Sequence, residues 1–183
     1  MLAAAQADAP WALQRLYEDL APAVTGYLRL RGAQEPDDLA SEAFLSVFRN
    51  VTTFTGNEPA FRSWVFTIAH RRLVDERRRQ RRRPDIDVFA ELPSLAGGDV
   101  ETEAFGLLGS AWVRDVLEEL TPEQRDVVLL RVLGDLSVDE VASIVGKRPG
   151  AVRALQHRGL DRLRGVLAAQ RAVMSAPPAG GRR

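Results

Sequence analysis

Apolar side chains recur at helical spacing along most of the chain. Leu13, Leu16, Leu20 and Val24 lie three or four residues apart, so they share one face of a helix. Similar apolar stripes follow within residues 36–49, 60–83, 112–120 and 122–132, and Thr121 and Gln124 form a capping box at the start of the last of these. No alternating pattern of useful length predicts a strand, and the sequence therefore predicts an all-α protein. Pro22 falls inside the first helix and is expected to kink or split it.

One segment interrupts the helical pattern. Residues 84–105 contain prolines, glycines and six acidic residues, but no basic residue and few large apolar side chains. Such a composition is typical of a linker. We therefore expect two small helical domains, residues 10–83 and 106–172, joined by a flexible acidic linker at 84–105. We expect residues 173–183 to form a disordered tail.

The most specific local pattern lies in residues 136–163. Ser137 and Glu140 form a capping box at the start of a short helix, and Gly146 ends that helix as a C-cap glycine. Pro149 then occupies the first position of a second helix. A short helix, a glycine turn and a basic amphipathic helix are the layout of a helix-turn-helix that reads DNA. The C-terminal domain is therefore predicted to contain a helix-turn-helix.

The second helix of this motif has one apolar face and one basic face. Val152, Leu155 and Gly159 are predicted to pack inward. The early residues of the opposite face are placed to reach base edges in the major groove, and those further along to reach phosphates. The early residues are Arg148, Pro149, Arg153 and His157, and the later ones are Arg158 and Arg162. The alternative is an ordinary helical hairpin with a solvated basic face.

Charge is unevenly distributed along the chain. The 25 basic and 25 acidic residues give a net charge of zero, which taken alone argues against a nucleic-acid partner. However, residues 71–83 hold eight arginines against two acids, and residues 147–164 hold six basic residues against one acid. Arginine binds phosphate through a planar fork of donors. Two arginine-rich segments, one in each predicted domain, therefore favour phosphate binding over two solvated helix faces.

Several classes of protein are disfavoured by what the sequence lacks. The absence of cysteine rules out disulfides and thiolate metal sites. Because His70 and His157 lie far apart, no multi-histidine metal centre is expected. No Ser/His/Asp set, glycine-rich phosphate loop or carboxylate pair beside a histidine points to an enzyme. We expect no catalytic residue, no metal and no cofactor. Since neither a membrane-spanning run nor a signal peptide is evident, we expect a cytoplasmic protein without membrane contact.

Two long segments resemble the conserved regions of one protein family. Region 4 of the bacterial sigma-70 superfamily resembles LTPEQRDVVLLRVLGDLSVDEVASIVGKRPGAVRALQHRGLDRLR. Region 2 resembles DDLASEAFLSVFRNV followed by FRSWVFTIAHRRLVDERRRQRRR. The order and the short linker match the small extracytoplasmic-function (ECF) group, and the likeness covers about residues 10–83 and 106–168.

The resemblance implies a sigma factor that binds RNA polymerase core and directs promoter-specific initiation by reading minus-10 and minus-35 elements. It implies contact with the clamp helices of the large polymerase subunit through Asp37, Asp38, Leu39, Glu42, Phe44, Leu45 and Phe48. It implies minus-10 recognition and melting through Asn57, Phe61, Arg62, Trp64, His70, Arg71, Arg72, Arg77, Arg78 and Arg79. It implies minus-35 recognition through Arg148, Pro149, Arg153, Ala154, His157, Arg158 and Arg162. The implied partners are promoter DNA, the polymerase clamp helices and flap, and an anti-sigma protein.

The chain departs from the family pattern in the recognition helix. Arg148 stands where many members have a small hydroxyl residue before the proline. Leu155 and Gln156 stand where many members have a basic residue followed by leucine. These differences change the side chains available for minus-35 contacts relative to many members of the family. A stand-alone helix-turn-helix regulator is the alternative function, although it leaves residues 37–83 without a role.

Overall fold

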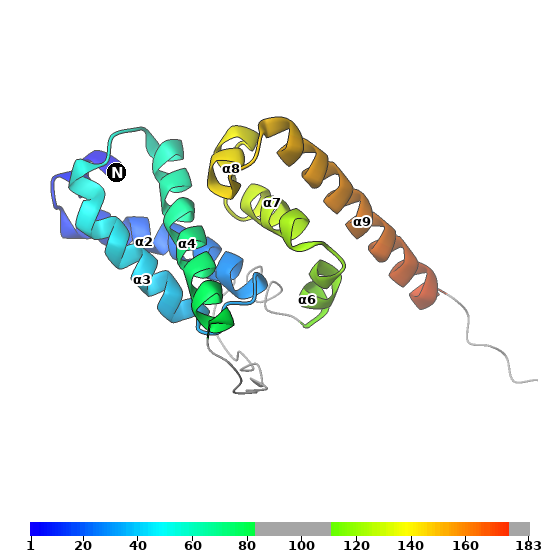
Figure 1. Cartoon of the computed structure of the whole chain (residues 1–183). Helices are drawn as coiled ribbons and strands as arrows, with labels where there is room; N and C mark the ends of the chain where they lie inside the picture. The colour runs from blue at the N-terminus through cyan, green and yellow to red at the C-terminus, as the bar shows by residue number, and fades with distance from the viewer. Residues whose placement is uncertain (83–110, 176–183) are drawn as a thin grey trace, which may run out of the picture.

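The computed structural model describes residues 1–82 and 111–175, which form two helical domains (Figure 1). The first domain contains α1 (Leu2–Gln6), α2 (Pro10–Leu30), α3 (Pro36–Asn50), the 3-10 turn η1 (Val51–Thr53) and α4 (Glu58–Arg81). The second contains α6 (Ala111–Glu118), α7 (Pro122–Val132), α8 (Val138–Val145) and α9 (Pro149–Ser175). Within these ranges there is no β-strand. The predicted all-α, two-domain fold is confirmed, while the linker predicted at 84–105 lies outside the described residues.

The core of the first domain forms where α2, α3 and α4 pack together. Its largest fully buried side chains include Tyr27 from α2 and Phe66 from α4. Helix α2 runs through Pro22 as one helix, so the predicted split does not occur. Leu20 and Val24, on either side of the proline, are both buried. Their packing keeps the helix continuous although proline removes one backbone hydrogen bond.

The short N-terminal helix α1 was not predicted from the sequence. Leu2 and Ala5 are buried against the first domain. The Gln6 Nε2 atom donates a hydrogen bond to the carbonyl oxygen of Phe54, at 2.7 Å. An alanine-rich helix of five residues carries no side-chain cap, so the sequence offers little local signal for it. Residues before position 10 therefore also belong to the first packed unit.

The second domain follows the predicted caps closely. Thr121 and Ser137 each form a complete capping box, which starts α7 and α8 respectively. Gly146 ends α8 in the left-handed conformation, with φ of 65°. Helix α9 continues to Ser175, beyond the boundary expected at residue 172, and residues 176–183 of the expected tail lie outside the described ranges. No helix in the described part of the chain has the length and hydropathy needed to span a membrane.

The two domains touch each other along one side. Helix α4 of the first domain packs beside α8 of the second (Figure 1). The N-terminal ends of α4 and α9 both lie at the top of the view in Figure 1. This arrangement places the helix-turn-helix next to the helix that ends in the arginine-rich segment.

Candidate functional site

Helices α8 and α9 form the predicted helix-turn-helix, and α9 packs closely on α7. Val152 and Leu155 are buried on the inner face of α9. Gly159 lies at the crossing with α7, where an added Cβ would sit 3.0 Å from Val128 Cγ2. A larger residue at position 159 would therefore push the helices apart. The close approach fixes which face of α9 remains exposed.

The opposite face of α9 carries exposed cations. All the residues predicted to read the minus-35 element are exposed except Pro149, which is partly buried. His157 and Arg162 have acidic neighbours, because His157 Nε2 lies 3.1 Å from Asp161 and Arg162 pairs with Glu119. In contrast, no ion pair or hydrogen bond within residues 1–82 and 111–175 engages the guanidinium groups of Arg148, Arg153 and Arg158. Those three arginines are available to a phosphate or a base edge.

An aromatic cluster lies under the loop that precedes α4. Phe54 stacks on Trp64 with ring centroids 5.0 Å apart, and it meets Phe61 edge-on at 5.4 Å. Phe61 is only 2% exposed, so it supports the loop from below, whereas Trp64 is partly exposed. Asn57 caps α4 by accepting a hydrogen bond from the Ala60 amide at 3.0 Å. The predicted minus-10 residues at this end are thus gathered around one loop.

The basic residues of α4 point in several directions. Arg71, Arg78 and Arg79 are exposed, and Arg62 is partly exposed. Arg72 forms a 3.4 Å ion pair with Glu42 of α3, which joins one predicted DNA residue to one predicted polymerase residue. His70 and Arg77 instead make contacts inside the molecule. The sequence predicts these last two residues on the DNA surface, because their contacts within the protein are not evident from the sequence.

The face of α3 predicted to bind polymerase is partly core. Leu39 and Phe44 are 7% and 2% exposed, so they are not accessible to a partner in this conformation. Leu45 is 55% exposed, Phe48 is half-buried, and Asp37, Asp38 and Glu42 are exposed. The sequence analysis did not single out Tyr17 of α2, which is 40% exposed and meets Phe44 edge-on at 4.9 Å. Tyr17 and Leu45 are the exposed large side chains of this region.

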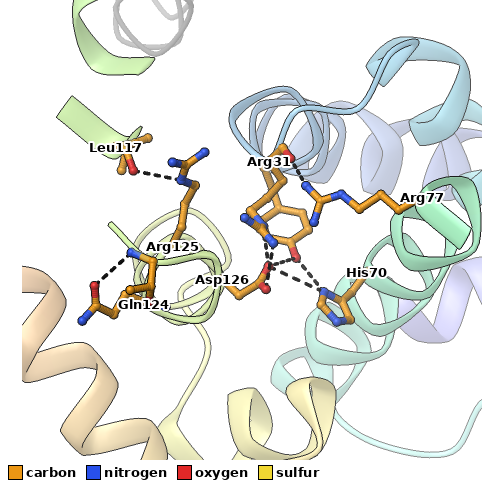
Figure 2. Close-up of polar contacts among 9 residues, drawn as sticks. Arg31, His70, Arg77, Leu117, Gln124, Arg125 and Asp126 are labelled. Carbon is orange, nitrogen blue, oxygen red and sulfur yellow. Dashed lines mark hydrogen bonds and ion pairs between the residues drawn. The ribbon is translucent and has the colours of Figure 1, made fainter. Parts of the chain in front are cut away.

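A polar cluster joins the two domains around Asp126 of α7 (Figure 2). The Asp126 carboxylate accepts hydrogen bonds from the Tyr27 hydroxyl at 3.1 Å and from Arg31 Nη2 at 2.9 Å. The Tyr27 oxygen also lies 2.7 Å from His70 Nδ1. Arg77 donates to the carbonyl oxygen of Arg31. The end of α2 and the middle of α4 therefore converge on one carboxylate of the second domain.

Burial changes the acid–base behaviour of this cluster. Burial raises the pKa of Tyr27 well above its ordinary value, and the nearby Asp126 charge adds to the increase. Burial lowers the pKa of His70, although Asp126 opposes that decrease. The neutral form of His70 is thereby favoured, and its Nδ1 faces the Tyr27 hydroxyl. Tyr27, Arg31 and Asp126 were not predicted as functional residues from the sequence. The one available signal was the charged Arg31, four residues after Tyr27 at the C-terminal end of an apolar helix.

The fold defines a two-domain helical protein whose second domain carries a DNA-reading helix-turn-helix, and comparison with known proteins gives its family. The family model for sigma-70 region 2 matches residues 16–83, and that for sigma-70 region 4 matches residues 110–163. The chain belongs to the sigma-70 family, in the ECF group. Sigma factors are non-enzymatic transcription initiation factors.

Individual ECF sigma factors show the same relationship. BldN of Streptomyces coelicolor is 33% identical over 166 residues, an alignment that covers 89% of this chain and 63% of BldN. The chain thus spans less than two thirds of the length of that relative. SigD of Mycobacterium tuberculosis is 32% identical over 167 residues, with 86% of this chain and 78% of SigD covered.

Two solved structures share the fold. CnrH in complex with the cytosolic domain of CnrY aligns with a TM-score of 0.65 and 23% identity, covering 92% of this chain and 95% of CnrH. The sigma factor RpoE in complex with the anti-sigma factor NepR from Bartonella quintana aligns with a TM-score of 0.63 and 18% identity. That alignment covers 85% of this chain and 96% of RpoE. At these identities the likeness concerns the fold alone.

Proposed function

We propose that this chain binds RNA polymerase core and directs promoter-specific initiation by reading minus-10 and minus-35 elements. The observation that carries the proposal is the outer face of α9, where Arg148, Arg153 and Arg158 are exposed above a capped helix-turn-helix. A second basic surface lies in the other domain, on α4. Two separate cationic surfaces suit a protein that reads two separate promoter elements.

The minus-35 element would be read as duplex by the start of α9. Arg148 directly precedes α9, and Arg153 and His157 lie within its first turns, where side chains of a recognition helix reach base edges. Pro149 and Ala154 would make apolar contacts there. Arg158 and Arg162 lie further along the helix, and phosphate contact suits them better.

The minus-10 element would be captured at the N-terminal end of α4. An unstacked base needs a pocket, a stacking surface and a basic track for its backbone. The loop ending at Asn57 would form the pocket, and partly exposed Trp64, which contacts Phe61, would supply the stacking ring. The basic track would comprise Arg62, His70, Arg71, Arg72, Arg77, Arg78 and Arg79.

The polymerase clamp helices would dock on the exposed part of α3. Leu45 would be the apolar contact, half-buried Phe48 would flank it, and Asp37, Asp38 and Glu42 would form the charged rim. Leu39 and Phe44 would support this face from inside the domain. The polymerase flap would contact the second domain. An anti-sigma protein is a further proposed partner, since one structure with this fold is of the sigma factor RpoE in complex with the anti-sigma factor NepR.

We further propose that the chain acts in the cytoplasm and catalyses no reaction itself. The domain boundaries that we propose are 10–83 for the polymerase and minus-10 domain and 106–172 for the minus-35 domain. The buried α1 extends the first boundary toward the N-terminus, and α9 extends the second to Ser175.

Transcription by a reconstituted polymerase tests this function. The purified chain is mixed with sigma-free core polymerase and a promoter library, and the transcripts are sequenced. We expect initiation at a defined pair of elements. DNA binding without core, combined with no promoter-specific initiation, would instead identify a stand-alone regulator.

Two arginine variants separate base reading from phosphate contact. Arg153→Ala should cost about 1–3 kcal/mol and relax selection at particular minus-35 positions. Arg79→Ala should weaken binding to all promoters similarly and reduce its salt dependence. Arg15→Ala is the control, because exposed Arg15 lies on α2 and pairs there with Asp19 at 3.4 Å. Identical effects of Arg153→Ala and Arg79→Ala would contradict the division of roles.

A further inference from the structure

The contact between the domains contains a buried ion pair. Arg31, at the end of α2, is 4% exposed and is the buried charged residue of the described chain. Its guanidinium group forms an ion pair with the carboxylate of Asp126, whose side chain is 16% exposed. A buried arginine is destabilising unless a negative group compensates its charge. Asp126, which lies 95 residues away in the other domain, supplies that charge.

Asp126 also lies among other cations. The charge of Arg31 contributes to lowering the pKa of Arg77 in the first domain and of Arg125 in the second, after the larger effect of burial. The Asp126 charge acts in the opposite direction on both groups. Arg125 is held in place by donating from Nε to the Leu117 carbonyl at 2.9 Å (Figure 2). Without Asp126, closing the domains would bring Arg31 and Arg125 together with less compensation.

The same contact involves α4, the helix assigned to the minus-10 element. His70 lies 2.7 Å from the Tyr27 hydroxyl and 4.0 Å from Asp126, and Arg77 donates to the Arg31 carbonyl. Helix α8 packs beside α4 and covers part of it. His70 and part of α4 are therefore engaged by the second domain, whereas Arg77 is engaged within the first domain.

The distance between promoter elements also requires the domains to separate. Elements centred near positions minus-10 and minus-35 are about 25 base pairs apart, or ~85 Å of B-form DNA at 3.4 Å per base pair. Helices α4 and α9 are only about 36 Å and 40 Å long, and their N-terminal ends lie on the same side of the molecule. The chain between Arg82 and Ala111 would reach roughly 100 Å if fully extended, so the covalent connection permits separation.

We propose that Asp126 is an interdomain latch that holds the free chain closed, with the minus-10 surface partly occupied by its own second domain. Tyr27 and Arg31 form the socket of the latch on the first domain. Only the consequence for promoter binding rests on the proposed function. The closed conformation itself can be tested on the free protein, without polymerase.

Energy transfer between two dyes measures the closed state. The chain contains no cysteine, so Gln14→Cys on α2 and Ala169→Cys on α9 introduce two exposed labelling sites. In this labelled background, Asp126→Asn removes the charge while keeping the shape. We expect the ratio of open to closed molecules to rise about 30-fold or more, the usual consequence of breaking a buried charge pair, and transfer efficiency to fall.

Matched variants separate the latch from a general effect of charge. Asp135→Asn makes the same charge change at an exposed position of the second domain, where φ is 50° and asparagine is also tolerated. We expect it to leave the transfer unchanged. Tyr27→Phe, which keeps the buried ring and removes only the hydroxyl, should lower transfer less than Asp126→Asn. Unchanged transfer in both Asp126→Asn and Tyr27→Phe, or an equal decrease in Asp135→Asn, would overturn the latch.

Binding of the free chain to a long mixed-sequence DNA duplex tests the consequence for DNA. Opening should free His70 from Asp126 and uncover the part of α4 that packs beside α8, so Asp126→Asn should bind this duplex more tightly than Asp135→Asn at the same ionic strength. Circular dichroism should show the same helical content in both variants. If Asp126→Asn opens the chain but binds the duplex no better than Asp135→Asn, the inhibitory role is wrong, although the latch remains.

Discussion

Gly159 shows how one residue sets the position of the recognition helix. Glycine inside a helix costs about 1 kcal/mol relative to alanine, yet α9 contains it at the crossing with α7. Val128 is buried and β-branched, so its Cγ2 atom has little freedom to move away from an added methyl group. The sequence analysis predicted that this glycine packs inward, because its position followed from helical periodicity.

Two glycines of α9 therefore should respond differently to the same change. At Gly165 an added Cβ meets open space, so Gly165→Ala should raise the free energy of unfolding by up to about 1 kcal/mol. The free energy of unfolding of Gly159→Ala should be lower than that of Gly165→Ala by about 1 kcal/mol or more, because Val128 must shift. Denaturant unfolding of the full chain measures both. Equal gains at the two positions would show that α7 and α9 do not pack closely.

His70 should make stability depend on pH. Burial lowers its pKa below 6.5, with Arg31 and Arg77 adding to the decrease and Asp126 opposing it. The native chain therefore binds fewer protons at His70 than the unfolded chain does, and stability rises with pH in that window. The contribution of neutral His70 to the free energy of unfolding is fully present above about pH 6.5 and should decline as the pH falls below that value.

Unfolding free energies at pH values of about 7.5 and 5.5 test this dependence. His70→Gln should show a smaller loss between the two values than the unsubstituted chain. His157→Gln, which changes an exposed imidazole on α9, is the matched control. An unaltered pH dependence in His70→Gln would show that His70 is not the titrating group.

At the scale of elements, the sequence predicts the features that depend on neighbouring residues, but it does not predict the contacts between residues far apart in the chain. The capping boxes at Thr121 and Ser137 and the turn at Gly146 depend on residues within a few positions, so the sequence predicts them. Helix α1 has no cap and is held by packing and by Gln6, which contacts Phe54 48 residues away. Such contacts leave no periodic pattern in the sequence.

Helix α3 shows the same limit within one element. Its apolar stripe predicts an inward face, but burial depends on how α2 and α4 cover that face. Leu39 is buried, while Leu45, six residues later, is 55% exposed. The predicted set of polymerase contacts therefore contains both supporting core residues and exposed ones.

Two substitutions in α3 should have opposite consequences. Leu45→Glu should leave the free energy of unfolding nearly unchanged and weaken binding to core polymerase about tenfold or more. Leu39→Glu should destabilise the chain by about 3 kcal/mol or more, because it buries an unpaired charge. Val132→Glu changes another exposed aliphatic residue, in the second domain, and is the control. Normal polymerase binding by Leu45→Glu would remove this face from the proposed interface.

At the scale of the whole molecule, the neutral total charge conceals two different groups of arginines: exposed ones in the second domain and others at the contact between the domains. Arg148, Arg153 and Arg158 remain available beside the helix-turn-helix, whereas the charges of Arg31, Arg77 and Arg125 act on one another and on Asp126 between the domains. The sequence analysis found the basic segments but missed Asp126. No local feature of the sequence around Asp126 indicates that it contacts residues 95 and 99 positions away.

A latch between the domains should reduce the apparent affinity for polymerase. If core polymerase binds only the open chain, part of its binding free energy is used to separate the domains. The apparent dissociation constant is then larger than the intrinsic one by the inverse of the open fraction. Asp126→Asn should therefore bind core polymerase more tightly, and the gain should match the increase in open fraction that energy transfer reports.

Competition with a labelled unsubstituted chain for core polymerase measures this gain. Asp135→Asn should compete as the unsubstituted chain does, because its carboxylate lies at an exposed position outside the latch. Leu45→Glu combined with Asp126→Asn should lose most of the gain, since opening the domains does not restore the docking face. If Asp126→Asn opens the chain without improving competition, polymerase must accept the closed conformation, and domain separation would then have to follow docking, driven by the two promoter elements.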